Sequence, residues 1–275
     1  MDARSLSRTE ARIVLPLEAE RRESISLEEI RRLSGASPGF ARKLAHSLVQ
    51  KGWLQPLRRG AYLLNPSQHG PDRLPDADPL RWGSMLVVPY YFGYATAAEL
   101  HGLLPQAGRL YYVVTPVRLA ARNFGTSRFR FVRAGADRLF GTETVRRRGR
   151  ELVVSDLERT VLDCVDRPSL SGGIGGVAHI LGRAKTRLRW DRLRRYLERC
   201  DNASLCQRTG YLLERIRPSV SPPRAWVRAV LPTPSSPYVP LAPARSHGRI
   251  GARDPRWHVI RNVADPELFS EGEFA

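Results

Sequence analysis

Residues 26–64, SLEEIRRLSGASPGFARKLAHSLVQKGWLQPLRRGAYLL, predict a helix, a turn, a second helix and a short β-hairpin, in this order. This is the order of a winged helix-turn-helix, in which the second helix enters the major groove of DNA. The turn of the hairpin carries two adjacent arginines, and the whole chain has a formal net charge of +18. Together these features predict double-stranded DNA as a ligand.

Local signals mark where the two helices begin and end. Ser26 and Glu29 have the spacing of a capping box, and Gly35 is suited to end the first helix. Ser37 is suited to cap the second helix, and Pro38 then occupies the first helical position, where no backbone N–H is needed. We therefore expect the first helix to end at Gly35 and the second to begin at Pro38.

The second helix has two different faces when its residues are placed at about 100° intervals. Its apolar side comprises Phe40, Ala41, Leu44, Ala45 and Leu48. Its opposite side comprises Gly39, Arg42, Lys43, His46 and Gln50. Polar side chains of this kind bind base edges in the major groove, and arginines of a wing bind phosphates or the minor groove. The expected DNA-binding residues are Ser37, Arg42, Lys43, His46 and Gln50 on the helix, with Arg58 and Arg59 on the hairpin.

Two other interpretations of this domain stay open at the level of sequence. The charged side of the helix is also what a small helical domain presents to solvent, without any ligand. Some winged helices bind protein instead of DNA. We favour DNA because the order of the elements, the hairpin and the excess of positive charge coincide.

Composition limits the class of protein. A length of 275 residues suggests two domains, and 42% hydrophobic residues are typical of globular chains. The 45 Lys and Arg against 27 Asp and Glu favour a polyanionic partner, although a GC-rich genome also raises arginine usage. No apolar run is long enough for a membrane span, and the first residues lack the apolar core of a signal peptide. The odd count of 3 cysteines indicates reduced thiols, so we expect a cytoplasmic protein with no membrane partner.

The chain divides at a proline-rich stretch, NPSQHGPDRLPDADP, at residues 65–79. We expect a DNA-binding domain at residues 1–66, a linker at 67–79 and a second domain at 80–275. The first domain should open with a helix near residues 7–15, ended by Pro16.

The second domain mixes strand and helix patterns, so the predicted fold class is α+β. RLYYVVTP (109–116) and RFRFVR (128–133) predict strands, and VRRRGRELVV (145–154) predicts a hairpin. Amphipathic helices follow, the first with an apparent capping box from Ser155 to Glu158. The proline-rich stretch at 217–243 predicts an extended surface segment, and residues 254–263 predict a late strand.

The blocks GYATAAELHGLLPQ and RLYYVVTP, then VVSDLERTVLDCVDRPSLSGGIGGVAHIL, then GYLLE and RWHVIRNV, resemble the AbiEi family. These are antitoxins of type IV toxin–antitoxin and abortive-infection systems. The resemblance covers about residues 7–265 and includes the winged helix. It implies an antitoxin whose N-terminal domain represses its own promoter by binding inverted repeats. It also implies a nucleotidyltransferase-like toxin as the functional partner, which the C-terminal domain counteracts without necessarily binding it stably.

Possible chemical sites have simpler structural interpretations. Asp156, Glu158, Arg159 and Asp163 suggest helix capping and an ion pair before they suggest catalysis. The glycines at 172–176 lack the ending of a phosphate-binding loop, so we expect a turn that opens a helix. The basic run from Arg146 to Arg150 is either an exposed hairpin turn or a second polyanion contact.

We therefore predict no catalytic residues, no metal site and no cofactor, and a protein that is not an enzyme. A single winged helix covers few base pairs, so we expect two copies on a repeat, through dimerisation or cooperative loading. Two alternatives concern the way the toxin is neutralised. In the first, the protein is an enzyme that modifies the toxin covalently, for example by phosphoryl transfer. In the second, it is a protein that sequesters the toxin.

Overall fold

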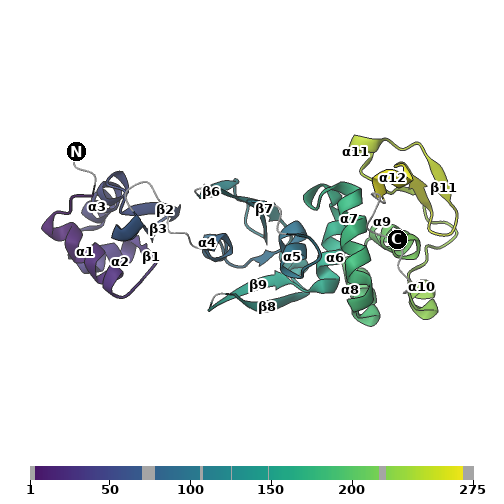
Figure 1. Ribbon diagram of the computed structural model, residues 1–275, viewed down its shortest axis with the longest axis horizontal. Coiled ribbons are helices and arrows are strands. Elements are labelled where there is room, and N and C mark those ends of the chain that lie inside the picture. Colours follow the sequence, from purple (N-terminus) through teal and green to yellow (C-terminus); the bar gives the residue numbers. More distant parts are fainter. Residues whose placement is uncertain are drawn as a thin grey trace. The chain divides into compact units, whose positions relative to one another are not determined.

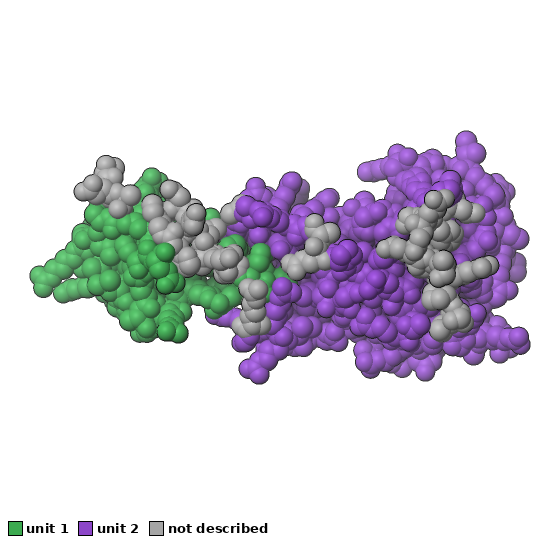
Figure 2. Space-filling view, in the orientation of Figure 1, with its two compact units in different colours: residues 1–86 green, residues 87–275 purple. Residues whose placement is uncertain are grey.

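The computed structural model describes residues 4–69, 78–105, 108–124, 126–147, 149–216 and 221–268. The chain forms two compact units, residues 1–86 and 87–275, which Figure 2 colours green and purple. The first unit combines helices with a small antiparallel sheet, and the second combines helices with a mixed sheet. The predicted α+β fold class is confirmed. Residues 80–86, which the sequence placed in the second domain, group with the first unit.

Unit 1 is built from helices around a three-stranded antiparallel sheet with strand order β1-β3-β2. The elements in chain order are α1 (Arg8–Ala19), β1 (Ser24–Ser26), α2 (Leu27–Ser34), α3 (Pro38–Gln50), β2 (Leu54–Arg58), β3 (Ala61–Leu64), the 3-10 turn η1 (Ser67–His69) and α4 (Pro79–Leu86). The helix, turn, helix and hairpin that the sequence predicted at residues 26–64 are all present. The core joins α1, α2 and α3 to the sheet through buried side chains such as Ile13, Ile30, Leu48 and Leu64.

The helix ends in unit 1 follow from side-chain caps. The Ser26 hydroxyl accepts from the Glu29 backbone N–H, and the Glu29 carboxylate accepts in return from Ser26, which completes the predicted capping box. Gly35 then ends α2 with a φ of 66°, in the left-handed region that glycine adopts most easily. Ser37 caps α3 as predicted.

The first helix is longer than the sequence indicated. It continues through Pro16 to Ala19, whereas we expected Pro16 to end it. Proline removes one intrahelical hydrogen bond, but Ile13, Val14 and Leu17 are buried on the inner side of the helix. The packing of these residues outweighs the local penalty.

Unit 2 contains a six-stranded mixed sheet with strand order β6-β7-β5-β4-β9-β8. Its strands are β4 (Tyr91–Phe92), β5 (Leu110–Thr115), β6 (Arg122–Phe124), β7 (Ser127–Arg133), β8 (Thr142–Arg147) and β9 (Arg150–Ser155), and α5 (Tyr94–Leu100) follows β4. β5 pairs with β7 and β4 pairs with β9 in parallel, and the other pairs are antiparallel. The predicted strands at 109–116 and 128–133 and the hairpin around Gly149 are confirmed.

Helices occupy the rest of unit 2, around the large core that α6 and α7 share with α8 and α9 (Figure 1). They are α6 (Leu157–Asp166), α7 (Gly173–Ala184), α8 (Trp190–Cys200), α9 (Ala203–Arg215), α10 (Arg224–Val230), α11 (Ala244–His247) and α12 (Asp265–Leu268). Short 3-10 turns lie at Ala136–Arg138, Pro168–Leu170 and Lys185–Arg187. A small second sheet is formed by β10 (Val239–Pro240), β12 (Val259–Arg261) and β11 (Ala252–Asp254).

The proline-rich stretch does not cross the surface as an extended segment, contrary to our expectation. Residues 217–220 lie outside the described part, but residues 221–243 contain α10 and β10. Trp226, Val227 and Leu241 are buried in the main core of the unit. These apolar side chains, not the prolines, decide the path of the segment.

Candidate nucleic-acid interface

The residues predicted to bind DNA lie on α3 and on the β2–β3 hairpin of unit 1. All of them are exposed, namely Ser37, Arg42, Lys43, His46, Gln50, Arg58 and Arg59. The Ser37 hydroxyl accepts from the Phe40 backbone N–H and so fixes the start of the helix. The other six side chains make no hydrogen bond or ion pair within the described residues, so their donors and charges are available to a ligand.

The hairpin turn is anchored on α2. The Gly60 carbonyl accepts a hydrogen bond of 2.8 Å from the Leu27 backbone N–H at the start of that helix. Gly60 has a φ of 72°, so the tight turn beside Arg58 and Arg59 uses the left-handed conformation that glycine permits. The structure therefore places the two arginines at the end of the hairpin that lies beside α2.

The helix α3 itself carries Arg42 and Lys43 and no carboxylate. The nearest acidic residues in the sequence, Glu28 and Glu29 on α2, are already paired with Arg31 and Arg22. A phosphate backbone that approaches Arg42 and Lys43 thus meets no opposing charge from this helix.

The sequence misplaced one residue of this surface. Phe40 was assigned to the apolar side of the helix, yet the residue is 49% exposed. At 100° per residue it lies at the rim between the two sides, where neighbouring elements decide burial. The helical pattern alone does not tell whether a residue at this rim is buried or exposed.

Glu10 of α1 holds the C-terminal half of α3 in place. Its carboxylate accepts from the Ser47 hydroxyl and from the Lys51 ammonium, at 2.7 Å each, and from the Ser7 backbone N–H at 2.8 Å. Burial acts to raise the pKa of Glu10, but the hydrogen bonds from Lys51, Ser7 and Ser47 outweigh it and lower the pKa to about 2. The ionised carboxylate is therefore the form that the fold stabilises.

We expect Glu10→Gln to destabilise unit 1 by about 1–3 kcal/mol at pH 7, because Lys51 loses its counter-charge in a buried site. Since the folded pKa lies below the unfolded one, this stabilisation is present above about pH 4.3 and is lost as the pH falls toward 2. Urea unfolding between pH 3 and 7 tests this. The matched control Glu28→Gln, in the exposed pair with Arg31, should change the free energy of unfolding by less than about 0.5 kcal/mol. Equal effects of both variants would contradict the prediction.

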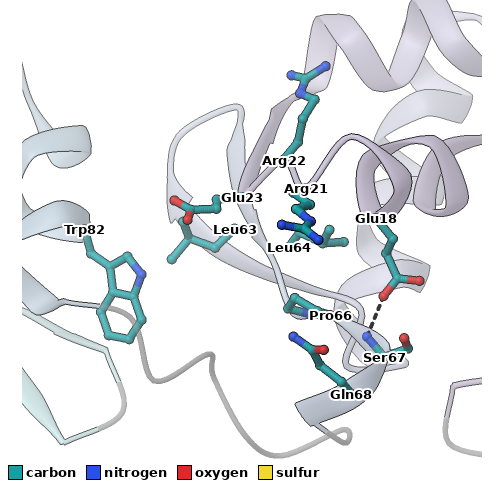
Figure 3. A pocket seen from close by; sticks show the side chains of 10 residues that line it. All are labelled: Glu18, Arg21, Arg22, Glu23, Leu63, Leu64, Pro66, Ser67, Gln68 and Trp82. Atoms are coloured by element: carbon teal, nitrogen blue, oxygen red, sulfur yellow. Dashed lines mark hydrogen bonds between the residues drawn. The ribbon is translucent and has the colours of Figure 1, made fainter. Parts of the chain in front are cut away.

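A cavity of about 540 Å³ lies elsewhere in unit 1 (Figure 3). It is lined by Glu18, Arg21, Arg22, Glu23, Leu63, Leu64, Pro66, Ser67, Gln68 and Trp82. Glu18 accepts from the Ser67 backbone N–H, and Glu23 pairs with Arg81 of α4. None of the residues predicted to bind DNA lines this cavity, so it is separate from the candidate interface.

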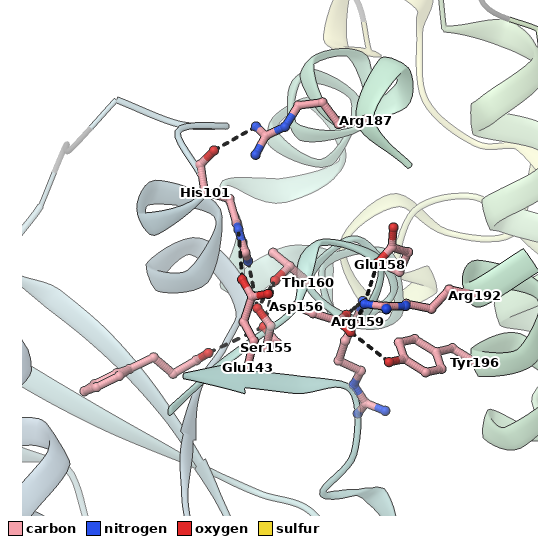
Figure 4. A network of polar contacts seen from close by, with 11 residues as sticks. His101, Glu143, Ser155, Asp156, Glu158, Arg159, Thr160, Arg187, Arg192 and Tyr196 are labelled. Carbon is pink, nitrogen blue, oxygen red and sulfur yellow. Dashed lines mark hydrogen bonds and ion pairs between the residues drawn. The ribbon is translucent and has the colours of Figure 1, made fainter. Parts of the chain in front are cut away.

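The acidic residues at the start of α6 in unit 2 form a structural network (Figure 4). Our expectation that Ser155 and Glu158 cap this helix is wrong, because Ser155 is the last residue of β9 and Asp156 is the cap. The Asp156 carboxylate accepts from the Arg159 backbone N–H at 2.8 Å and from the Tyr196 hydroxyl at 2.7 Å. Glu158 accepts from the Arg189 backbone N–H at 2.7 Å. These bonds join α6 to α8 and leave both carboxylates engaged.

A buried ion pair lies one turn further along α6. The predicted pair of Arg159 and Asp163 is confirmed, with 2.9 Å between Nε and Oδ1. The Tyr91 hydroxyl donates to the other carboxylate oxygen of Asp163 at 3.0 Å. Burial raises the pKa of Asp163 to about 6, against the opposing effects of Arg159 and Tyr91. The pair connects α6 to the central strand β4.

The glycine motif lies at the turn that opens α7, and the basic run lies on the β8–β9 hairpin. Gly172 and Gly173 have φ values of 80° and 77° at the turn that opens α7, and a Cβ on Gly176 would lie 2.1 Å from the Ser171 carbonyl oxygen. The glycines thus fit a tight turn before a helix. Of the basic run, Arg146 and Arg150 are exposed on the β8–β9 hairpin, and Arg148 lies outside the described residues.

In the described ranges no cluster of His, Cys, Asp and Glu is placed to hold a metal ion. Over the same ranges, no helix has the length and apolarity that a bilayer span requires.

The fold of this chain is similar to that of a solved structure. It is the RV2827C protein from Mycobacterium tuberculosis, at 18% identity and a TM-score of 0.67, and the match covers 96% of this chain and 95% of that chain. At this identity the likeness establishes the fold, a two-unit α+β architecture. Residues 91–215 match the model of the AbiEi antitoxin C-terminal domain. The resemblance stated from the sequence is thereby confirmed for residues 91–215, and this match supports an antitoxin role. Among curated proteins, none matches the chain significantly.

Proposed function

We propose that this protein is the antitoxin and the DNA-binding autorepressor of a type IV toxin–antitoxin operon. In this proposal unit 1 is a winged helix-turn-helix that binds inverted repeats in the protein's own promoter. Unit 2 contains the AbiEi antitoxin domain and counteracts a nucleotidyltransferase-like toxin. The protein acts in the cytoplasm, as a binding protein without catalytic residues.

One observation carries the DNA-binding part. On α3, Arg42, Lys43 and His46 are exposed and have no partners within the described residues, and the helix itself carries no carboxylate. A helix with this side chain chemistry suits base edges, and exposed arginines on a hairpin suit phosphates. A face that served only for solubility would not require all of these donors to stay unpaired.

The size of the surface supports two copies on the operator. One recognition helix reads only a few base pairs, so an inverted repeat supplies a second half-site for a second molecule. The two half-sites should lie about 10 base pairs apart, centre to centre, or a multiple of this distance. Footprinting on the promoter measures this spacing directly.

The primary experiment is a titration of the promoter fragment with the full-length protein, followed by fluorescence anisotropy. We expect tight binding that weakens steeply as salt increases, because each neutralised phosphate releases counterions. A scrambled fragment of equal length should bind more weakly by a factor on the order of 10³ or more. Equal affinity for both fragments would exclude the autorepressor.

We expect Lys43→Ala combined with His46→Ala to abolish discrimination between the promoter and the scrambled fragment. Both side chains lie on the outward face of α3 and support no internal contact, so thermal unfolding should not change. The matched control replaces Arg8 and Arg12, two exposed arginines of α1, by alanine. The control should retain discrimination even though it removes more charge. A double variant of α3 with wild-type selectivity would contradict the proposal.

The antitoxin part is tested by co-expression with a nucleotidyltransferase-like toxin gene, which this proposal expects beside the gene for this protein. Growth should be rescued by the full chain and also by the α3 double variant, because neutralisation belongs to unit 2. Affinity purification and the intact mass of the toxin then separate the mechanisms. A stable complex would indicate sequestration, and an added mass on the toxin would indicate an enzyme. Failure of rescue would reject the antitoxin assignment.

A further inference from the structure

Phe40 is an exposed aromatic side chain in the first turn of α3. The residue is 49% exposed and is not part of the hydrophobic core of unit 1. Its backbone N–H is held by the Ser37 hydroxyl, so the residue sits in a fixed helical turn and not in a loose end. A single exposed apolar side chain is ordinary on a protein surface, so the meaning of this one depends on the charged residues and the open space around it.

The surroundings of Phe40 are cationic. Lys43 follows three residues later and therefore lies beside Phe40 on the helix surface. The preceding Gly39 has nothing within 4 Å of the place where a Cβ would be, and Arg42, also exposed, lies further round the same helix. An apolar ring is thus bordered by open space on one side and by free positive charge on the other. A partner that fits this combination is an anion that presents apolar groups.

We propose that Phe40 recognises the 5-methyl group of thymine in the major groove of duplex DNA. This inference rests on the proposed DNA-binding function and adds a specificity-determining residue to it. The N-terminal residues of a recognition helix are those that reach base edges, and phenylalanine is suited to contact the thymine methyl. The flanking cations bind the phosphates that border the same groove.

The geometry also distinguishes DNA from RNA. Uracil lacks the methyl group, and the deep, narrow major groove of an RNA duplex does not admit a helix. A Phe40 ring on a major-groove helix therefore selects thymine-containing duplex DNA. The preference should appear at one or two fixed positions in each half-site, because one ring covers about one base step.

The experiment begins with selection of duplexes from a random library by the full-length protein. Each thymine in the selected site is then replaced singly by deoxyuridine, which removes only the methyl group, and the Kd is measured at constant salt. For the wild-type protein we expect affinity to fall about fourfold at one or two positions, the value for one buried methyl group. Phe40→Ala should bind more weakly and should show no further loss at these positions.

Leu15→Ala is the matched control, since Leu15 is also a large, exposed apolar residue of unit 1 but lies on α1. It should keep the wild-type response to deoxyuridine. If a site is selected but Phe40→Ala responds to deoxyuridine as the wild type does, the thymine contact is refuted while DNA binding stands. If a site is selected and the wild-type protein tolerates deoxyuridine at every position, the thymine contact is likewise refuted while DNA binding stands. If no duplex is enriched, both the inference and the proposed function fail.

Discussion

Replacing Arg159 by methionine is expected to destabilise unit 2 by about 3–5 kcal/mol at pH 7.5. The side chain of Arg159 is only 7% exposed and that of its partner Asp163 is 6% exposed. The guanidinium also lies 4.4 Å from the centre of the Phe140 ring. Methionine fills much of the volume but leaves the carboxylate buried without its cation. Urea unfolding measures the loss.

An exposed ion pair on α8 serves as the control, because it has the same spacing along the helix but is not buried. Arg194 and Glu198 are also four residues apart and form an ion pair of 2.5 Å, but their side chains are 39% and 57% exposed. Arg194→Met should change the free energy of unfolding by less than about 0.5 kcal/mol. Adding Asp163→Asn to Arg159→Met should restore much of the stability, because the uncompensated charge is removed. No recovery in this double variant would argue against the electrostatic explanation.

The pH dependence of Arg159→Met follows from the pKa of Asp163. Burial raises that pKa to about 6 in the wild type, and without Arg159 it rises further. A raised folded pKa means that the contribution of Asp163 to stability is complete below its unfolded pKa of about 3.9 and is lost as the pH rises through the folded value. The stability of the variant should therefore be closer to wild type at pH 5 than at pH 7.5.

Replacing Gly210 by alanine is expected to destabilise unit 2 by about 3 kcal/mol or more. A Cβ at Gly210 in α9 would lie 2.0 Å from the Trp257 ring. The indole is fully buried, and its Nε1 donates to Glu214 at 2.7 Å, so the ring has no room to withdraw. Overpacking of this kind exceeds the roughly 1 kcal/mol by which alanine is otherwise preferred in helices.

The thermal midpoint of unit 2 measures this effect, at about 2–4 °C for each kcal/mol. Gly39→Ala is the control, because it is also a helical glycine but has nothing within 4 Å of the added Cβ. It should leave the midpoint of unit 1 unchanged or raise it slightly. Should Gly210→Ala prove neutral, the close contact between α9 and Trp257 would be absent in solution.

The sequence predicted those features that short-range contacts determine. The Ser26–Glu29 capping box, the Gly35 helix end and the Ser37 cap each depend on residues within a few positions, and all three are present. The alternation in RFRFVR likewise marks the strand β7, in which Phe129 is buried and Arg130 is exposed. The outward position of Arg42, Lys43, His46 and Gln50 follows from the helical periodicity of α3. Their role in binding stays a prediction.

The features that the sequence did not predict depend on distant neighbours. Pro16 is tolerated within α1 because tertiary packing compensates for the missing hydrogen bond. Asp156 and not Ser155 caps α6 because β9 extends through Ser155. Residues 221–243 fold inward because Trp226 and Leu241 fill a core supplied by other helices. The exposure of Phe40 belongs to the same group, since its position at the rim of α3 fits either environment.

The strand β4 consists of only two residues, yet it lies between β5 and β9 in the six-stranded sheet. Phe92 is paired with Val113 on one side and with Val154 on the other. Tyr91 in the same strand donates its hydroxyl to Asp163, which ties it to α6. Without this dipeptide the sheet would separate into the ribbon β6-β7-β5 and the hairpin β8-β9. Tyr91 and Phe92 thus join the two halves of the sheet, and the continuity of the six-stranded sheet depends on its shortest strand.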